Sequence, residues 1–497
     1  MFMYTDSQGQ SVLDYDKYRK IGIRFDDDGD IEDFNPNAFA RHLCRTFDIA
    51  IRYDILYYLY KDNYYQAVTE LELKRLLYNY FNSLVPDAWT TSFEYGYLAA
   101  YKRLMPRCEE LISGIDVINL TNGIFSVSSG KLLPHDKKIF TATQIPVEYN
   151  EDSDCPVFKD FLYDIFNQDK SLVSITQELM GYCLTNSTQA HKFFLLFGTG
   201  RNGKSVLLKV ITALVGADNT CNLSLKSFGI PFELAEIVDK RVNISTESEV
   251  HGATLRTDKL KAIVAGDSIQ INPKNEKPFS HLPITKLIFA INRLPATADT
   301  SEGFVDRLII LPFDKKYVPN PKNDMQGKLD PNLKDKLLLE LDGIFIFALE
   351  GLKRLIANDY IFSESKRATK LLRQFVASNN PFVDFIDTRL TIEDAVKIPR
   401  TQVYDDFKAW AKYQGFVSHS NMSARTFYSD LTAELSSRGI YLETPKIRGT
   451  IYFRGITLRT NTTAMNKKKP VATKDSSKKV VGADSMVLFA DTQDDTD

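Results

Sequence analysis

One segment of the chain has the residue types and the spacing of a phosphate-binding loop. It is a GxxxxGK[ST] motif made of Gly198, Thr199, Gly200, Arg201, Asn202, Gly203, Lys204 and Ser205. The backbone N–H groups of such a loop can curl around a polyphosphate, the Lys204 ammonium can reach the β and γ phosphates, and the Ser205 hydroxyl can ligate Mg²⁺. The motif therefore predicts that a nucleoside triphosphate is bound, with ATP and Mg²⁺ as the expected cofactors.

Hydrolysis of a bound triphosphate needs further groups, and three candidates follow the loop. Glu247 comes first after the predicted strand 240–246 and is the candidate catalytic acid and second metal ligand, with Glu249 in reserve. This strand alternates apolar and polar residues, so a surface turn with two acids is the alternative. Asn292 ends a later apolar strand, where a γ-phosphate sensor would lie, and Arg307 could supply positive charge to the transition state from a neighbouring subunit.

The elements that must position these residues are also visible in the sequence. An apolar run of strand length, residues 191–197, leads into the loop, and a helical pattern over 206–216 leaves it. Strands and helices go on alternating through residues 186–375, which is typical of an α/β domain with a parallel-sheet core. The expected fold class is therefore α/β and multidomain.

The order of these motifs resembles the superfamily 3 helicases of the phage, plasmid and poxvirus primase-helicase type, AAA+ relatives that assemble as hexameric rings. The resemblance covers roughly residues 111–460 and includes Asn122-Gly123 and the segments 134–156 and 179–185. It implies that Lys204 and Ser205 hold phosphate and Mg²⁺, that Glu247 is the catalytic acid, that Asn292 is a sensor, and that Arg307 is a finger acting in trans.

Two lysines are expected to contact DNA. Lys274 and Lys277 lie on the hairpin that, in the family resembled, projects into the ring channel and grips one strand. Lysines on a turn bounded by Pro and Asn can follow phosphates without reading sequence. A solvated turn is the alternative interpretation.

The last segment covered by the resemblance, residues 395–460, is basic. Residues 395–460 hold ten bases and five acids, a balance of 10 - 5 = +5, on two amphipathic helices followed by a predicted pair of strands. This pattern suits a winged helix with Arg425 on its second helix and Lys446 and Arg448 on the wing. Binding of duplex or origin DNA is what the resemblance implies, and protein contact is the alternative.

The chain is expected to divide into five parts. They are an acidic α+β region of unclear role (1–110), a pre-helicase domain of strands and then helices (111–185), the AAA+ helicase domain (186–375), the winged helix (381–460) and a disordered polar tail (461–497). Strands are predicted over 139–149 and over 440–447.

The N-terminal region is acidic, with 13 bases and 18 acids over residues 1–110, a balance of 13 - 18 = -5. Six of these acids lie between Asp26 and Asp33, most simply in a solvated loop, although Asp26 and Asp28 also form a DxD pattern that a primase could use for metal. A strand–turn–strand is predicted around Asp62 and Asn63, followed by a capping-box helix start at Thr69. The region is short for a primase, so priming is doubtful.

Composition excludes several classes. The 497 residues are 43% hydrophobic with five cysteines and no CxxC pair, which excludes a disordered chain and a disulfide scaffold and favours reduced cytosolic thiols. Neither a secretory leader nor a membrane span is recognisable, so a soluble cytoplasmic protein is expected. The net charge of -2 is a cancellation between an acidic N-terminal region and a basic C-terminal one.

Together these features predict an ATP-dependent replicative DNA helicase of a phage or mobile genetic element. It would be a homo-hexameric ring that hydrolyses ATP at subunit interfaces and moves along one DNA strand, with a primase or polymerase as a further partner. Two alternatives stay open: an origin-binding replication initiator, and an AAA+ helicase loader or remodeller that does not separate strands.

Overall fold

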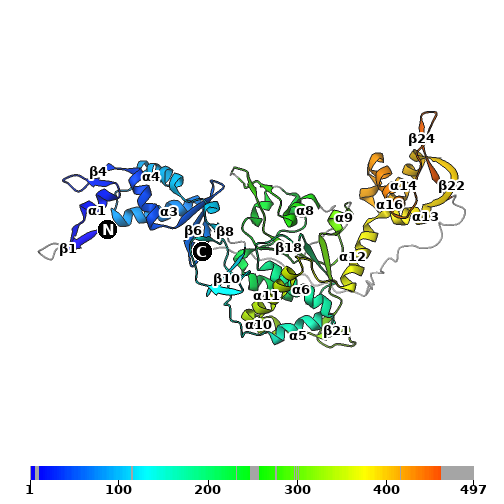
Figure 1. Ribbon diagram of the computed structural model, residues 1–497, viewed down its shortest axis with the longest axis horizontal. Coiled ribbons are helices and arrows are strands. Elements are labelled where there is room, and N and C mark those ends of the chain that lie inside the picture. Colours follow the sequence, from blue (N-terminus) through cyan, green and yellow to red (C-terminus); the bar gives the residue numbers. More distant parts are fainter. Residues whose placement is uncertain are drawn as a thin grey trace, which may run out of the picture.

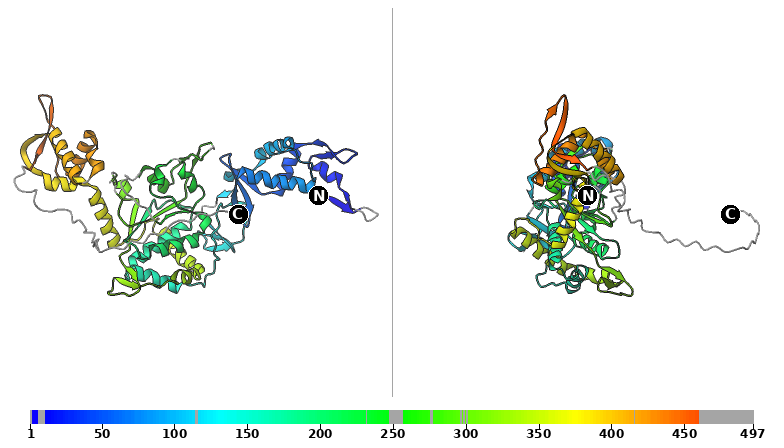
Figure 2. Two further views of the ribbon diagram at one scale, coloured as in Figure 1. Left: turned by 180° about the vertical axis from the view of Figure 1, so that it is seen from behind. Right: turned by 90° about the vertical axis from the view of Figure 1, so that its right-hand side faces the viewer.

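The structure is a computed structural model that describes residues 2–5, 11–113, 116–230, 232–246, 257–274, 277–295, 297, 299, 301–414 and 416–459. Its elements form three parts that follow one another along the longest axis (Figure 1). The reverse view shows the same succession (Figure 2). Each part has a buried hydrophobic cluster of its own, and the central part has one on each face of its sheet.

The N-terminal part packs helices against small antiparallel sheets. Its elements are β1 (Met3–Thr5), β2 (Ser11–Leu13), α1 (Tyr15–Lys20), β3 (Ile23–Phe25), β4 (Ile31–Phe34), α2 (Pro36–Thr46), β5 (Ile49–Arg52), β6 (Leu56–Lys61), β7 (Tyr64–Val68), α3 (Glu70–Leu84) and α4 (Thr91–Leu104). The predicted strand–turn–strand is confirmed by β6 and β7, whose turn holds Asp62 and Asn63 in the left-handed conformation. The capping box is confirmed too, because Thr69 and Glu72 exchange side-chain and backbone hydrogen bonds.

The acidic run closes the turn between β3 and β4. Asp26 Oδ1 accepts the backbone N–H groups of Asp28 at 3.0 Å and of Asp30 at 2.9 Å. One carboxylate of the run therefore has a structural role in the turn.

A short-stranded region and two helices link this part to the central sheet. They comprise η1 (Cys108–Glu110), β8 (Ile112–Ser113), β9 (Val117–Leu120), β10 (Gly123–Ser126), β11 (Lys131–Leu133), β12 (Ile139–Phe140), α5 (Pro156–Ile165) and α6 (Lys170–Cys183). The strand predicted over 139–149 is wrong beyond Phe140. Past that residue the chain forms single contacts, such as Ile145 N donating to Asn119 O at 2.8 Å, and Pro146 has no N–H to give to a ladder.

The centre of the molecule is a five-stranded parallel sheet, which confirms the predicted parallel-sheet core. Its order is β14 (Thr220–Cys221), β15 (Val242–Ser245), β18 (Lys286–Ile291), β13 (Phe193–Phe197) and β19 (Leu308–Pro312). Alternate residues of β13 face opposite sides, so Phe194 lies in one hydrophobic cluster and Phe193 in the other.

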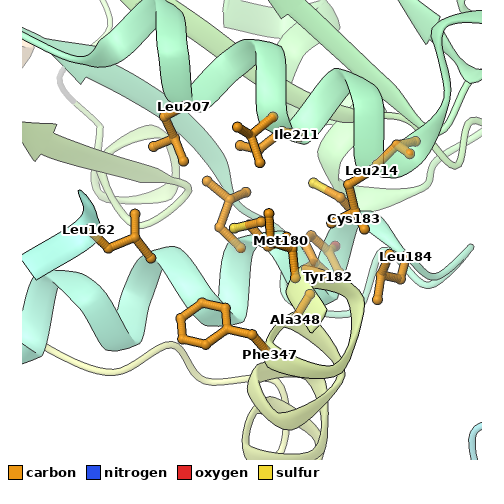
Figure 3. Packing of buried hydrophobic residues seen from close by; sticks show 14 of the residues in the cluster. Leu162, Met180, Tyr182, Cys183, Leu184, Leu207, Ile211, Leu214, Phe347 and Ala348 are labelled. Atoms are coloured by element: carbon orange, nitrogen blue, oxygen red, sulfur yellow. The ribbon is translucent and has the colours of Figure 1, made fainter. Parts of the chain in front are cut away.

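Different helices cover the two faces of this sheet. One face is packed by α5, α6, α7 (Lys204–Val215), α10 (Leu333–Leu338) and α11 (Leu341–Ala357), and the other by η3 (Ser227–Gly229), η4 (Glu233–Ile237), α8 (Thr257–Ala265) and α12 (Lys366–Asn379). Figure 3 shows Leu207 of α7, Met180 of α6 and Phe347 of α11 meeting in the first of these cores. Among the described helices, none is long and apolar enough to span a membrane.

Strand β15, which leads toward the candidate acid, is buried although it contains polar residues. Asn243 is fully buried, with its Oδ1 accepting from Leu223 N at 2.7 Å and its Nδ2 donating to Leu223 O at 3.0 Å. Its amide is thereby satisfied inside the sheet. The polar residues of this strand therefore reflect internal hydrogen bonds and not an exposed face.

Two buried cationic side chains, Arg241 just before β15 and Lys286 at the start of β18, lie against the C-terminal end of α6. Arg241 donates from Nε to Thr143 Oγ1 and from Nη1 to Leu184 O, each at 2.6 Å. Lys286 donates to Thr185 O at 2.5 Å, and its Nζ lies 4.9 Å from the centre of the Tyr182 ring. Carbonyl groups at a helix C-terminus favour cations, yet burial lowers the pKa of Lys286 to about 7 and that of Arg241 to about 10.

The buried lysine should make stability depend on pH. Lys286 has a pKa of about 7 in the folded chain against an ordinary lysine value of 10.5, so between pH 7 and pH 9 the unfolded chain holds a proton that the folded chain has lost. The free energy of unfolding should therefore rise with pH, by up to about 1.4 kcal/mol per unit from this group. Urea unfolding at pH 7, 8 and 9 should show a shallower rise in Lys286→Met, while Lys322→Met, at an exposed site, keeps the wild-type slope. Equal slopes in both variants would contradict the assignment.

The C-terminal part has a separate core around Phe385, Phe407 and Phe427. Its elements are α13 (Pro381–Arg389), β22 (Leu390–Pro399), α14 (Arg400–Gln414), α15 (Val417–Ser420), α16 (Ala424–Ser437), β23 (Lys446–Ile447) and β24 (Thr450–Leu458). The strand predicted over 440–447 is wrong except for its last two residues, since the long partner of β24 is β22. A register shift between Glu393 and Lys397 breaks the alternation of β22, which hides it in the sequence.

Candidate functional site

The phosphate-binding loop lies between the end of β13 and the start of α7. Gly198 N donates to Ile291 O at 3.1 Å, and Asn202 Nδ2 donates to Phe313 O at 3.1 Å, so both neighbouring strands hold the loop. Gly203 is the N-cap of α7 with φ 86°, and a Cβ there would lie 2.8 Å from Ile165 Cγ2. No side chain caps the helix, which leaves its first N–H groups available to an anion.

Lys204 is the buried cation of this loop, with 5% of its surface exposed. Its Nζ donates to Gly198 O at 2.6 Å, to Asn202 Oδ1 at 3.1 Å and to Asn292 Oδ1 at 3.4 Å. All three acceptors are neutral, and burial lowers the pKa of the ammonium to about 8. A desolvated ammonium with only neutral acceptors is stabilised when an anion binds beside it. The residues present therefore fit a polyphosphate.

A cavity of about 620 Å³ opens over the loop at the carboxyl ends of the parallel strands. Ser205 lines it, together with Thr246 after β15 and Asn292 after β18. Ligands of open α/β sheets bind at this edge, because the turns that follow parallel strands gather there. The structure therefore brings Lys204, Ser205 and Asn292 together, as the sequence predicts.

A second wall of the cavity has no motif in the sequence. It comes from β20 (Lys316–Val318), β21 (Gln326–Lys328) and the start of α10, and its lining residues are Tyr317, Pro319, Lys328, Leu329, Asp330 and Leu333. Tyr317 ties this wall to the site, because its N donates to Arg201 O at 2.7 Å and its hydroxyl donates to Asp164 Oδ2 at 2.5 Å. Thr246 and Val206 line the cavity without having been predicted, although each adjoins a predicted site residue in the sequence, Glu247 and Ser205 respectively.

The candidate acid Glu247 and its reserve Glu249 lie outside the described residues. Within the described part of the chain, no cluster of three or more His, Cys, Asp or Glu side chains could hold a metal ion. Among the described residues, the Ser205 hydroxyl therefore fits the predicted Mg²⁺ ligand, and Thr246, which follows β15, lines the same cavity.

Arg307 lies at the other end of the sheet from the loop. It immediately precedes β19, and its carbonyl accepts from Phe193 N, at the start of β13, at 2.8 Å. β13 runs from Phe193 to the loop with a rise of about 3.3 Å per residue. The start of β13, beside Arg307, is therefore roughly 16 Å from the start of the loop. Arg307 Nη1 donates to Gly303 O at 2.5 Å, and no described residue accepts from its buried Nε. The structure therefore does not bring Arg307 to the nucleotide cavity of its own chain.

The predicted DNA-contact residues lie away from the nucleotide cavity. β16 (Ile269–Ile271) and β17 (Phe279–His281) form an antiparallel hairpin, and Lys274 and Lys277 are exposed on the segment that joins them. The other three, which are exposed in the C-terminal part, are Arg425 in the first turn of α16, Lys446 in β23 and Arg448 in the turn before β24.

A strand, a glycine-rich loop and a helix N-terminus within a parallel sheet define a P-loop nucleotide-binding domain. Three family models match the chain: "D5 N terminal like" over residues 101–167, "Family of unknown function (DUF5906)" over 196–307, and "Poxvirus D5 protein-like" over 377–454. Two of these models are of the poxvirus D5 type, a superfamily 3 helicase type, and this similarity confirms the resemblance seen in the motifs.

Individual relatives are distant. The chain is 24% identical over 322 residues to "Putative helicase L207/L206" of Acanthamoeba polyphaga mimivirus, an alignment that covers 60% of this chain and 33% of that protein. The chain thus spans about a third of the length of this curated relative. Among solved structures, an apo form of the NrS-1 C-terminal region is similar over 86% of this chain and 100% of that one, with a TM-score of 0.49 and 10% identity.

Proposed function

We propose that this chain is an ATP-dependent DNA helicase that works as a homo-hexameric ring, the arrangement implied by its resemblance to superfamily 3 helicases. The observation that carries the proposal is the state of Lys204, a buried ammonium whose described acceptors are all neutral, beneath a cavity of about 620 Å³. Mg²⁺ would be held by Ser205, the nucleotide and Glu247, and would neutralise charge on the transferred phosphoryl group. Asn292, hydrogen-bonded to Lys204, would report the γ-phosphate.

In the ring, a neighbouring subunit would supply the arginine that the nucleotide cavity of a single chain lacks. Arg307 lies at the opposite end of β13 from the loop, so a finger role requires the nucleotide of a neighbouring subunit. The site would then be complete only at a subunit interface, which couples hydrolysis to ring assembly.

We further propose that residues 381–459 form a winged helix that binds duplex DNA. The order α13, β22, α14, α15, α16, β23, β24 and the three-stranded sheet β22-β24-β23 support this proposal. Arg425 at the start of α16 and Lys446 and Arg448 beside the wing would contact phosphates.

The hairpin lysines provide the direct test of strand separation. Replacing both Lys274 and Lys277 with alanine should leave nucleotide binding unchanged and lower displacement of a forked duplex by about tenfold or more. Loss of two phosphate contacts should also reduce the slope of log affinity for single-stranded DNA against log salt by about 1.4. The exposed pair Lys353 and Lys370, replaced together, is the matched control.

Three results would point elsewhere. Normal unwinding by the Lys274/Lys277 variant would remove the hairpin from the mechanism. DNA-stimulated ATPase without strand displacement by the wild type would indicate a helicase loader or remodeller. If deletion of residues 381–497 abolished binding to one specific DNA while the wild type unwound nothing, an origin-binding initiator would be the better description.

A further inference from the structure

The turn between β5 and β6 reaches from the N-terminal part onto the central part. Tyr53 and Asp54 in this turn have φ values of 55° and 61°, a left-handed conformation that is uncommon for non-glycine residues, above all for a bulky side chain such as tyrosine. Tyr53, Ile55 and Leu56 pack against the hydrophobic cluster on the face of the sheet that also carries α8 and the β16–β17 hairpin. The unusual backbone therefore presents these side chains to a different part of the molecule.

The ring of Tyr53 is stacked on the base of the hairpin that carries Lys274 and Lys277. Its centre lies 5.0 Å from that of Phe279 with an interplanar angle of 27°, and its hydroxyl lies 3.3 Å from Nδ1 of His281. Phe279 and His281 are alternate residues of β17 and are both buried. One side chain thus contacts the hairpin strand at two successive positions of one face.

The two strands that flank this turn contact the segment just before β15, the strand that leads to the nucleotide cavity. Arg52 Nη1 lies 2.8 Å from Asp239 Oδ1, and the hydroxyl of Tyr58 donates to the other oxygen of this carboxylate. Asp239 lies three residues before β15, which ends beside Thr246 in the cavity wall. Both side chains of the ion pair are mostly buried, so salt should screen it less than an exposed pair.

The junction borders a cavity that is open to solvent, since Leu282 in its wall is 58% exposed. This cavity of about 290 Å³ is lined by Arg52, Asp239, His281 and Leu282, among others. No described residue bonds His281 Nε2, although this atom is buried. A polar junction beside such a cavity can shift at lower cost than a close-packed core.

We propose that Tyr53 and Arg52 are positioning residues for the DNA-contacting hairpin, through which the N-terminal part couples DNA engagement to the nucleotide site. This inference rests on the proposed function. Tyr53 holds the base of the hairpin so that Lys274 and Lys277 are presented to DNA. Arg52, through Asp239, joins that contact to the start of β15. The N-terminal part then serves translocation although none of its described residues lines the nucleotide cavity.

Tyr53→Ala in the full-length chain tests the coupling. ATP hydrolysis without DNA and nucleotide affinity should stay within about twofold of the wild type, while stimulation by single-stranded DNA and displacement of a forked duplex fall about tenfold or more. Tyr53→Phe keeps the ring and loses the hydroxyl, so a smaller loss is expected. Arg52→Met removes the ion pair but keeps an apolar stem and should also uncouple. Tyr95→Ala, at a side chain of the same part that is 81% exposed, is the matched control.

The outcomes separate this inference from the proposed function. If the wild type shows neither DNA stimulation nor unwinding, the proposed function falls and the inference falls with it. If the wild type unwinds and Tyr53→Ala and Arg52→Met unwind equally well with normal DNA stimulation, the inference alone is wrong. Thermal unfolding identifies a variant that has lost its fold. Should Tyr53→Ala unfold, the result with Tyr53→Phe and Arg52→Met decides: unimpaired DNA stimulation in both rejects the inference, and a selective loss of it supports the inference.

Discussion

Replacing Lys204 with alanine is expected to lower the rate of ATP hydrolysis by at least about a hundredfold, the usual cost of removing a group that stabilises transition-state charge. Strand displacement should be lost with it. The physical reason is that the ammonium is already desolvated beneath the cavity and has no described anionic partner there, so its interaction with phosphate is strong. Steady-state ATPase and forked-duplex displacement measure the two losses.

Although it abolishes activity, the same substitution should not lower the thermal stability of the nucleotide-free protein. Removing a buried charge that only neutral groups compensate should leave the melting temperature unchanged or raise it, whereas addition of ATP and Mg²⁺ should raise it only in the wild type. Lys209→Ala, at an exposed position of the same helix, should behave as the wild type in every assay. A Lys204→Ala protein that still unwinds a forked duplex would overturn the assignment.

The parts of the site that the sequence predicts are those encoded by contiguous residues. The loop from Gly198 to Ser205 specifies its own conformation, and the apolar run before it and the helical pattern after it can pack in few ways. Asn292 could be placed beside Lys204 because parallel strands end at one edge of a sheet, and the two side chains are indeed 3.4 Å apart. Local rules likewise predict the turn at Asp62 and the cap at Thr69.

The parts that the sequence could not predict depend on contacts between distant segments. Tyr317 enters the cavity wall because it bonds Asp164 on a helix that precedes the loop, and no spacing rule relates these two residues. Tyr53 belongs to no motif of the sequence, yet its ring packs on Phe279. The strand β22 was hidden by its bulge and its acidic residues. In each case tertiary packing determines where the residue or strand lies, and such packing produces no periodic pattern in the sequence.

The position of Arg307 gives the second large expected effect. Arg307→Ala should lower ATP hydrolysis by about a thousandfold or more, the range known for arginine fingers. Nucleotide affinity of the monomer should stay near the wild-type value, because Arg307 lies at the far end of β13 from Lys204 in its own chain. Equilibrium binding of a labelled non-hydrolysable nucleotide, run beside the ATPase assay, separates these effects. Full activity of Arg307→Ala would show that the finger assignment is wrong.

Mixing the two inactive variants tests whether the finger acts in trans. When Lys204→Ala and Arg307→Ala subunits are co-expressed in equal amounts and assemble at random, about a quarter of the interfaces combine an intact Lys204 with an intact Arg307. ATPase should therefore recover to as much as about a quarter of the wild-type rate if each interface works independently. A finger acting within one chain predicts no recovery, since every subunit then lacks one of the two groups. Cooperation between interfaces lowers the steady-state rate of a mixed ring, so hydrolysis of ATP in a single turnover is the appropriate measurement. If the mixture hydrolyses no ATP in a single turnover, a site shared between subunits is excluded.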